Sequence, residues 1–417
     1  MPGDAPALPF GALDMTADEV ERRFRQARER GTPRWLWPEL PVERWMAGRR
    51  EIVRVAGELL AGRPARLDAG DAVGAEALGI AAFTLGMGAL LGHWIERGSL
   101  QARPSTAALL RLHLEHGRAR AERAAAELDA ALAVLAAAGA TATVIKGMHT
   151  ARAFFPEPGT RPMTDIDLVI DPEHVPAAER ALAAAGYQRL RGDFQRHPYH
   201  ADWRPPGHSG RDASLALAHR DNPLTVNLHA SFDRTTGTGT LRMGTPGPGD
   251  TAAMPGVRTP SRVLAGPFLL ATLAAHAAEH RENLLLVRVV ELVLAMRAGA
   301  DVTALRAFLD ARRMAHHVYP ALALAERLAP GTVDAELLAF LEARSGARVR
   351  KVVEALDLSA LQRLDQPVAG GRTLAVRGPA DRARAVLTWL VPHRSPARLA
   401  AAYRSRLERL IRLLARR

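Results

Sequence analysis

Two stretches decide the fold of this chain: Val144-Ile-Lys-Gly-Met-His-Thr150 and Arg161-Pro-Met-Thr-Asp-Ile-Asp-Leu-Val-Ile170. The first overlaps a short β-branched run, residues 141–145, which lies between two glycines and predicts a buried strand. In the second, residues 165–170 alternate acidic and apolar side chains, which predicts a half-buried strand. The two stretches therefore predict two strands joined by a short helix and a turn-rich loop.

The elements around these strands extend the pattern. Helices are predicted over residues 148–155 and 175–185, and a further strand over residues 224–229. Residues 191–222 show little regular structure beyond a weak strand signal at 214–219. The order of strand, helix, strand and helix indicates a small α/β unit.

Asp165 and Asp167 are the first candidate site residues. Side chains alternate across a strand, so the two carboxylates emerge on the same face about 6–7 Å apart. They repel each other unless a positive charge lies between them, and oxygen ligands suit magnesium. The alternative interpretation is that the two aspartates only mark the solvent-facing side of a half-buried strand, because such tripeptides are common.

Lys146 and Gly147 come directly before the predicted helix at 148–155. The glycine permits close approach of the backbone, and the beginning of a helix offers free N–H groups to a phosphate. Lys146 adds a compact positive charge, and it is one of only two lysines in a chain that otherwise uses arginine. The alternative is an ordinary surface lysine.

The rest of the chain has mainly helical periodicity. A capping box at Thr16-Ala-Asp-Glu19 begins the first helix. Further helices are predicted over residues 49–61, 75–97, 106–138, 267–279, 282–297, 302–313, 319–328 and 333–356. The predicted fold class is α+β and predominantly helical, with a small mixed-sheet α/β core between two helical regions. The predicted boundaries are 1–138 for the N-terminal helical region, 139–234 for the core, 235–260 for a flexible loop and 261–417 for the C-terminal helical domain.

Composition excludes several classes of protein. The chain has 417 residues and no cysteine, which excludes disulfide frameworks, thiol nucleophiles and iron–sulfur clusters and indicates a cytoplasmic protein. The N-terminus has no secretory pattern, and the longest uncharged run, residues 77–95, is too rich in glycine to predict a transmembrane segment. The net charge of +12 is compatible with nucleic-acid binding but does not identify it.

The motifs together resemble a known family. The order is VIKG, a spacer with turns, RPMTDIDLVI, a helix ending in AAAGY and a strand ending in NLH. This order is similar to that of the uncharacterised nucleotidyltransferase family of the polymerase-β-like superfamily. The resemblance covers roughly residues 75–330 and is strongest over 130–190.

The resemblance implies a nucleotidyl-transfer site. The turn at Lys146 and Gly147 corresponds to the position where the superfamily usually has Gly-Ser, which cradles a triphosphate. By the same resemblance Asp165 and Asp167 would hold two magnesium ions, with manganese as a substitute. Arg161 and Thr164, in the loop before the acidic pair, would contact phosphate.

One position departs from the pattern. Related sequences usually have a third carboxylate where this chain has Asn227. An asparagine can ligate a cation through its carbonyl oxygen but cannot serve as a general base. His229 is then a candidate catalytic base, a partner of the metal ligands, or a structural hydrogen-bonding residue.

Two other signals indicate competing functions. His276-Ala-Ala-Glu279-His280 matches the H-x-x-E-H pattern of zinc proteases, although no third ligand is identifiable beyond Glu282 and Glu291. The basic amphipathic stretch 395–417 predicts a helix that packs through its leucines or that binds a membrane or nucleic acid.

The predicted function is therefore magnesium-dependent transfer of a nucleoside monophosphate, or a related phosphoryl unit, from a nucleoside triphosphate (NTP). The acceptor would be a hydroxyl group of a small molecule, peptide or protein. Two alternatives stay open. One is a catalytically weakened module that binds a nucleotide or a partner and keeps the fold, because of Asn227. The other is a basic protein that binds nucleic acid.

Overall fold

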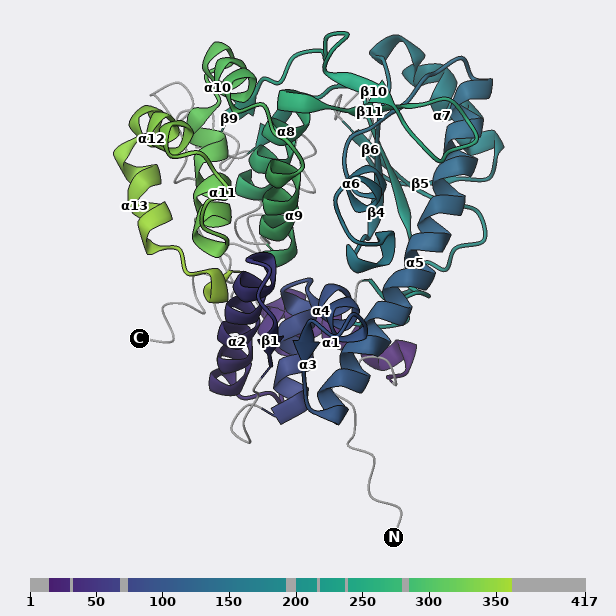
Figure 1. Ribbon diagram of the computed structural model, residues 1–417. Coiled ribbons are helices and arrows are strands. Elements are labelled where there is room, and N and C mark those ends of the chain that lie inside the picture. The colour runs from purple at the N-terminus through teal and green to yellow at the C-terminus, as the bar shows by residue number, and fades with distance from the viewer. Residues whose placement is uncertain are drawn as a thin grey trace.

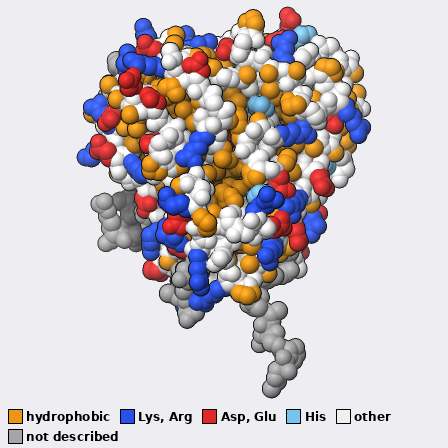
Figure 2. All heavy atoms as spheres, in the orientation of Figure 1, with side chains coloured by type: hydrophobic (Ala, Val, Ile, Leu, Met, Phe, Trp, Pro, Cys, Tyr) orange, Lys and Arg blue, Asp and Glu red, His pale blue; other side chains and the backbone are white. Residues whose placement is uncertain are grey.

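The computed structural model describes residues 15–30, 33–67, 74–192, 200–215, 218–236, 239–279 and 285–361. Figure 1 shows an N-terminal group of helices at the bottom, a sheet with its covering helices at the upper right, and a C-terminal group of helices at the left. In the same orientation, Figure 2 shows hydrophobic side chains concentrated along the middle of this face, between the C-terminal helices and the sheet. The fold is α+β and predominantly helical, as predicted.

The N-terminal group contains short helices and one pair of very short strands. Its elements are α1 (Ala17–Arg30), the 3-10 helix Pro33–Leu36, α2 (Val42–Leu60), β1 (Ala65–Arg66), α3 (Gly74–Thr84), α4 (Gly88–Glu96) and β2 (Leu100–Gln101). Half of the predicted capping box is present: the backbone N–H of Glu19 donates to Thr16 Oγ1 at 3.3 Å, whereas the carboxylate of Glu19 accepts from Arg22 and Arg23. Strands β1 and β2 pair in parallel.

The prediction of one helix over residues 75–97 is wrong. The chain bends by 114° between α3 and α4. Gly86 has a φ of +71° at this bend, and a Cβ there would lie 2.6 Å from the side chain of Val287. Within the described residues no single helix is long and apolar enough to cross a membrane, although α3 and α4 pass that test when taken together.

Helix α5 (Pro104–Ala137) connects the N-terminal group to the sheet. It is 34 residues long, which corresponds to about 51 Å of α-helix. Pro104 occupies its first turn, where a missing N–H leaves no hydrogen bond unmade. Its N-terminal half packs closely on α4, and its C-terminal half contributes to the hydrophobic cluster beneath the sheet.

The sheet has seven strands in the order β10-β11-β3-β4-β7-β6-β5. Their bounds are β3 (Thr143–Val144), β4 (Asp165–Val169), β5 (Gln188–Gly192), β6 (His200–Arg204), β7 (Thr225–His229), β10 (Thr251–Ala253) and β11 (Arg262–Leu264). The central strand β4 runs antiparallel to β3 and parallel to β7. Helices α6 (Met148–Ala153) and α7 (Val175–Ala184) follow β3 and β4, so the predicted α/β unit is confirmed.

The sheet extends beyond the predicted core. Strand β6 and the end of β5 lie in the region 191–222, which was predicted to have little regular structure. The weak strand signal at 214–219 is not confirmed, because the described residues 214–215 and 218–219 form no strand. The segment 235–260, predicted as a flexible loop, contributes the edge strand β10. It also contains most of a hairpin formed by β8 (Arg234–Thr236) and β9 (Gly239–Leu241). The prediction of a loop there is therefore corrected.

The C-terminal group consists of helices that pack on one another and on the N-terminal group. They are α8 (Gly266–Glu279), α9 (Leu286–Arg297), α10 (Val302–Ala311), α11 (Ala315–Leu328), α12 (Ala335–Arg344) and α13 (Ala347–Ala355). The single helix predicted over 333–356 is wrong, because the chain breaks at Ser345 and Gly346 between α12 and α13. The predicted helix at 395–417 lies outside the described residues.

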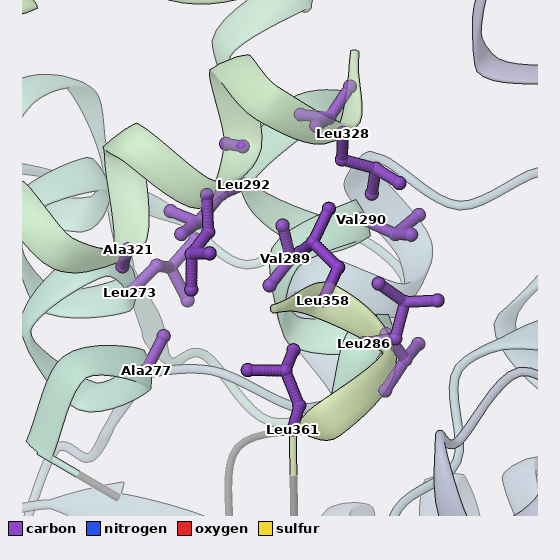
Figure 3. Packing of buried hydrophobic residues seen from close by; sticks show 14 of the residues in the cluster. Leu273, Ala277, Leu286, Val289, Val290, Leu292, Ala321, Leu328, Leu358 and Leu361 are labelled. Atoms are coloured by element: carbon purple, nitrogen blue, oxygen red, sulfur yellow. The ribbon is translucent and has the colours of Figure 1, made fainter. Parts of the chain in front are cut away.

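One hydrophobic cluster joins the two helical groups. It runs from α1 and α2 through α3 and α4 to the C-terminal helices. Figure 3 shows a part of it, in which side chains of α8, α9 and α11 meet Leu358 and Leu361 from the segment after α13. Buried Arg49 of α2 reaches the same segment and donates to the carbonyl oxygen of Ser359 at 2.6 Å. The N-terminal and C-terminal regions therefore share one core.

The contact between α4 and α5 generates a test of packing. A Cβ at Gly92 would fall inside van der Waals distance of the backbone carbonyl of Leu110. We expect Gly92→Ala to lower the free energy of unfolding by about 1–3 kcal/mol, although alanine usually stabilises a helix. Urea denaturation measures this change. Gly249→Ala is the control, since a Cβ there meets nothing within 4 Å; equal stability of both variants would contradict the close contact.

Candidate functional site

Strands β4 and β7 place three polar side chains together. Ile166 and Leu168 of β4 are buried in the cluster with α5 and α7, so alternation directs Asp165 and Asp167 to the other face. Asn227 of β7 lies beside Asp167 in the parallel register. Its Nδ2 donates to Asp165 Oδ2 at 2.9 Å. The predicted metal-binding trio is therefore brought together in space.

Asp167 is a buried anion with two basic neighbours. Its side chain is 5% exposed, and Lys146 Nζ donates to its Oδ2. On the other side, His229 Nε2 lies 3.4 Å from Asp167 Oδ1. Burial alone raises the pKa of a carboxyl, but Lys146 and His229 outweigh it and hold the pKa of Asp167 far below its ordinary value. Asp167 is therefore ionised at neutral pH.

Gly147 turns the chain from β3 into α6. It has a φ of +67°, in the left-handed region that favours glycine. The hydroxyl of Thr150 donates to its carbonyl oxygen at 3.1 Å. This turn directs Lys146 toward Asp167, which is 21 positions later in the chain.

Arg161 is fixed by a partner that the sequence pattern did not indicate. Its Nε donates to Glu291 Oε1 at 2.7 Å, and its Nη2 donates to Glu291 Oε2 at 3.1 Å. Both side chains are largely buried. Burial raises the pKa of a carboxyl, but Arg161 reverses this and lowers the pKa of Glu291. This two-bond pair links the loop before β4 to α9. Thr164, at the end of the same loop, places its Oγ1 3.4 Å from Asp165 Oδ1.

Arg120 of α5 is bonded to the loops before β4 and β7, and the sequence pattern did not indicate it. Its side chain is buried, with the residue 1% exposed, and its hydrogen-bond partners among the described residues are all backbone atoms. Its guanidinium donates to five backbone carbonyl oxygens, those of Met163, Thr164, His219, Asn222 and Pro223. Burial lowers its pKa to about 10, so the group stays protonated at neutral pH. The loops before β4 and β7 are thus tied to one cation.

A cavity of about 400 Å³ lies in front of the acidic pair. Every predicted site residue except Asn227 and His229 lines it. The N-terminal group supplies an apolar part of the wall, where Trp37 and Phe83 meet edge to face at 5.7 Å between ring centres. Helix α9 supplies Val287 and Arg288.

Two histidines form another part of this wall. His116 of α5 and His219 of the loop before β7 lie with ring centres 4.2 Å apart. Their Nδ1 atoms accept backbone N–H groups of Arg220 and Asp221, so the neutral rings carry their proton on Nε2. Burial and the neighbouring imidazole lower the pKa of His116 to about 4, and burial lowers the pKa of His219. Both rings are neutral at neutral pH.

The donor atoms around the acidic pair fit a divalent cation. Asn227 Oδ1 is buried without a hydrogen-bond partner, and the carboxylates of Asp165 and Asp167 lie beside it. Oxygen atoms from two carboxylates and an amide match magnesium or manganese. Among the described residues, no group of three His, Asp or Glu side chains could hold a metal. A cation here would therefore depend on the amide oxygen and on other ligands.

The competing zinc pattern is only partly visible. His276 lines the cavity, whereas His280 and Glu282 lie outside the described residues. Glu291, the other candidate ligand, is already bonded to Arg161 by both oxygens.

Comparison with known proteins gives one finding. A family model described as "Uncharacterised nucleotidyltransferase" matches residues 71–330. The matched segment includes α3 to α5, the whole sheet, and α8 to α11. No curated protein and no solved structure gives a significant match.

The bonds of Arg120 predict a large effect on stability. Arg120→Met leaves buried carbonyl oxygens without donors, so we expect the free energy of unfolding to fall by about 3 kcal/mol or more. Urea denaturation measures the change. Arg111→Met is the matched control, because Arg111 is an exposed arginine on the same helix. A loss in Arg120→Met no larger than in this control would argue against the described role.

The neutral histidine pair predicts a dependence of stability on acid. In the unfolded chain His116 takes up a proton near its ordinary pKa of 6.5, whereas in the folded protein the pKa is about 4. Its contribution to stability is therefore complete above pH 6.5 and is lost as the pH falls toward 4. We expect His116→Gln to reduce the slope of unfolding free energy against pH in this interval. His174→Gln is the control, and an unchanged slope in His116→Gln would refute the assignment.

Proposed function

Because the chain belongs to the uncharacterised nucleotidyltransferase family, we propose that it transfers a nucleoside monophosphate from an NTP to an acceptor hydroxyl. The observation that carries the proposal is the position of Asp165 and Asp167 on the wall of a cavity that Lys146 also lines. Carboxylates beside a cationic side chain suit a substrate that brings both phosphate and a divalent cation. The acceptor would be a small molecule, a peptide or a protein.

We assign the cation to Asp165, Asp167 and the amide oxygen of Asn227. Magnesium, or manganese in its place, supplies neutralisation of phosphate charge and orientation of the reacting groups when bound. Asp167 is already ionised, so no proton has to leave it first. Asn227 directs its N–H at Asp165 and leaves its oxygen without a partner, which is the orientation that a cation ligand requires.

Lys146 and His229 have separate tasks in this proposal. Lys146 lines the cavity and is bonded to Asp167, so it can turn from the carboxylate to a phosphate oxygen when a cation replaces its charge there. His229 Nε2 lies 3.4 Å from Asp167 Oδ1, the oxygen that Lys146 does not bond. Its ring stacks on His200 of β6 at 5.7 Å between ring centres. We therefore assign His229 to positioning Asp167, in place of the role of catalytic base.

The second candidate function is a module that binds a nucleotide without transferring it. The specific observation is Asn227, which by the resemblance stands where related sequences usually have a third carboxylate and which cannot accept a proton from an acceptor hydroxyl. The same cavity, Lys146 and acidic pair would then serve binding alone. Pyrophosphate release separates the two functions, because only transfer produces it.

The acidic pair provides the direct test. Incubation with each of the four NTPs, magnesium or manganese, and cell extract as the source of acceptor should release pyrophosphate. We expect Asp165→Asn and Asp167→Asn each to lower this rate about 100-fold or more, because each removes charge that the cation needs. Asp171→Asn is the control, since Asp171 is exposed just after β4.

Three outcomes are informative. Pyrophosphate release that both variants retain would remove this site from the reaction. Nucleotide binding without pyrophosphate release would favour the binding module. Absence of both binding and release with all four NTPs would overturn both candidate functions.

A further inference from the structure

Six charged side chains line or border the cavity near the acidic pair, three of each sign: Lys146, Arg161 and Arg288, and Asp165, Asp167 and Glu291. Two cations already have carboxylate partners in the fold. Lys146 is bonded to Asp167, and Arg161 holds both oxygens of Glu291. Asp165 has Asn227 as its hydrogen-bond donor. Arg288 is the one cation of these six side chains that has no carboxylate partner among them.

Arg288 lies in the first turn of α9, one helical turn before Glu291. Its Nη1 is buried without a hydrogen-bond partner. The nearest carboxylate on its own helix, Glu291, is taken up by the two-bond contact with Arg161. Burial lowers the pKa of Arg288, and the charge of Arg161 lowers it further. A buried N–H donor of a charged group without a partner is unfavourable unless a ligand supplies an acceptor.

The surroundings of Arg288 indicate the charge of that ligand. Arg288 lines the same cavity as Asp165 and Asp167, and their charges favour its protonated form. Figure 1 shows α9 across from β4 and α6, so the part of the cavity wall that contains Arg288 comes from a different element than the part that contains Asp165 and Asp167. A ligand that reaches both parts meets carboxylates, which need a cation, at one and a guanidinium with an unpartnered nitrogen at the other. A polyphosphate carrying a divalent cation has both properties.

We propose that Arg288 is the residue that binds the polyphosphate chain of the NTP, opposite the acidic pair. This inference rests on the proposed function and assigns a second wall of the same site. Guanidinium groups recognise phosphate through two parallel N–H···O bonds, which a point charge cannot reproduce. Arg161 does not compete for this role, because Glu291 already fixes its fork.

The test is calorimetric binding to the full chain, with and without magnesium. The probes are ATP, inorganic tripolyphosphate and adenosine. We expect Arg288→Met to bind ATP and tripolyphosphate about 10- to 100-fold more weakly, because a charged hydrogen bond to the ligand is lost. Adenosine, which has no phosphate, should bind Arg288→Met as it binds the wild type. Arg297→Met is the matched control, because Arg297 is an exposed arginine at the other end of α9.

Arg288→Lys keeps the positive charge but lacks the paired N–H donors of the guanidinium group. It also covers the case in which the methionine variant does not fold. We expect its affinity for tripolyphosphate to lie between those of the wild type and Arg288→Met, or below the wild type if only the lysine variant folds. Wild-type affinity for tripolyphosphate in either folded Arg288 variant overturns the role of Arg288 and leaves the proposed function standing. Equal losses for adenosine and tripolyphosphate also overturn it, because they indicate a structural residue. A wild-type protein that binds neither ATP nor tripolyphosphate refutes the proposed function itself.

Discussion

Buried charge beside the central strand is the constraint on which the rest of the structure depends. A charge removed from water is tolerated only when an opposite charge or several dipoles surround it. Asp167 satisfies this condition through Lys146 and His229, and Glu291 satisfies it through Arg161. In the part of the chain that the structure describes, Arg120 satisfies it through dipoles, by donating to carbonyl oxygens of two loops. Each of these contacts joins segments that are distant in the sequence, so the site and the fold are stabilised by the same bonds.

The helical regions on both sides of the sheet complete the cavity. The sheet and α6 supply the acidic pair and the turn at Lys146 and Gly147. The N-terminal group closes one side with Trp37 and Phe83, and α9 closes another with Val287 and Arg288. Since the two helical groups share one hydrophobic core, their positions relative to the sheet are fixed together. The wall has both apolar and charged parts, which suits a ligand with a charged part and an uncharged part.

Local patterns predicted the centre of the fold well. Strand β4 lies within the alternating stretch 165–170, and β3 lies within the β-branched run 141–145. Both were predictable because each pattern reflects the burial of a single strand. Strands β5 and β6 at one end of the sheet and β10 at the other were missed, because their residues are mostly polar or turn-forming and pair only through contacts with the rest of the sheet. The break between α3 and α4 was missed for a similar reason. The apolar run 75–97 predicts one helix, and only the packing of Val287 against Gly86 shows that the chain bends there.

The sequence by itself determined the family, the candidate acidic pair and the turn that precedes it, because these follow from periodicity and from short motifs. The resemblance found in those motifs agrees with the family model over residues 71–330. Only the tertiary structure decided which charges are neutralised and which are not. Glu291 lies 130 positions after Arg161, and Arg120 lies about 100 positions before the loop that it caps at Asn222 and Pro223. No local pattern encodes such separations, because burial and partner choice arise only when distant segments pack together.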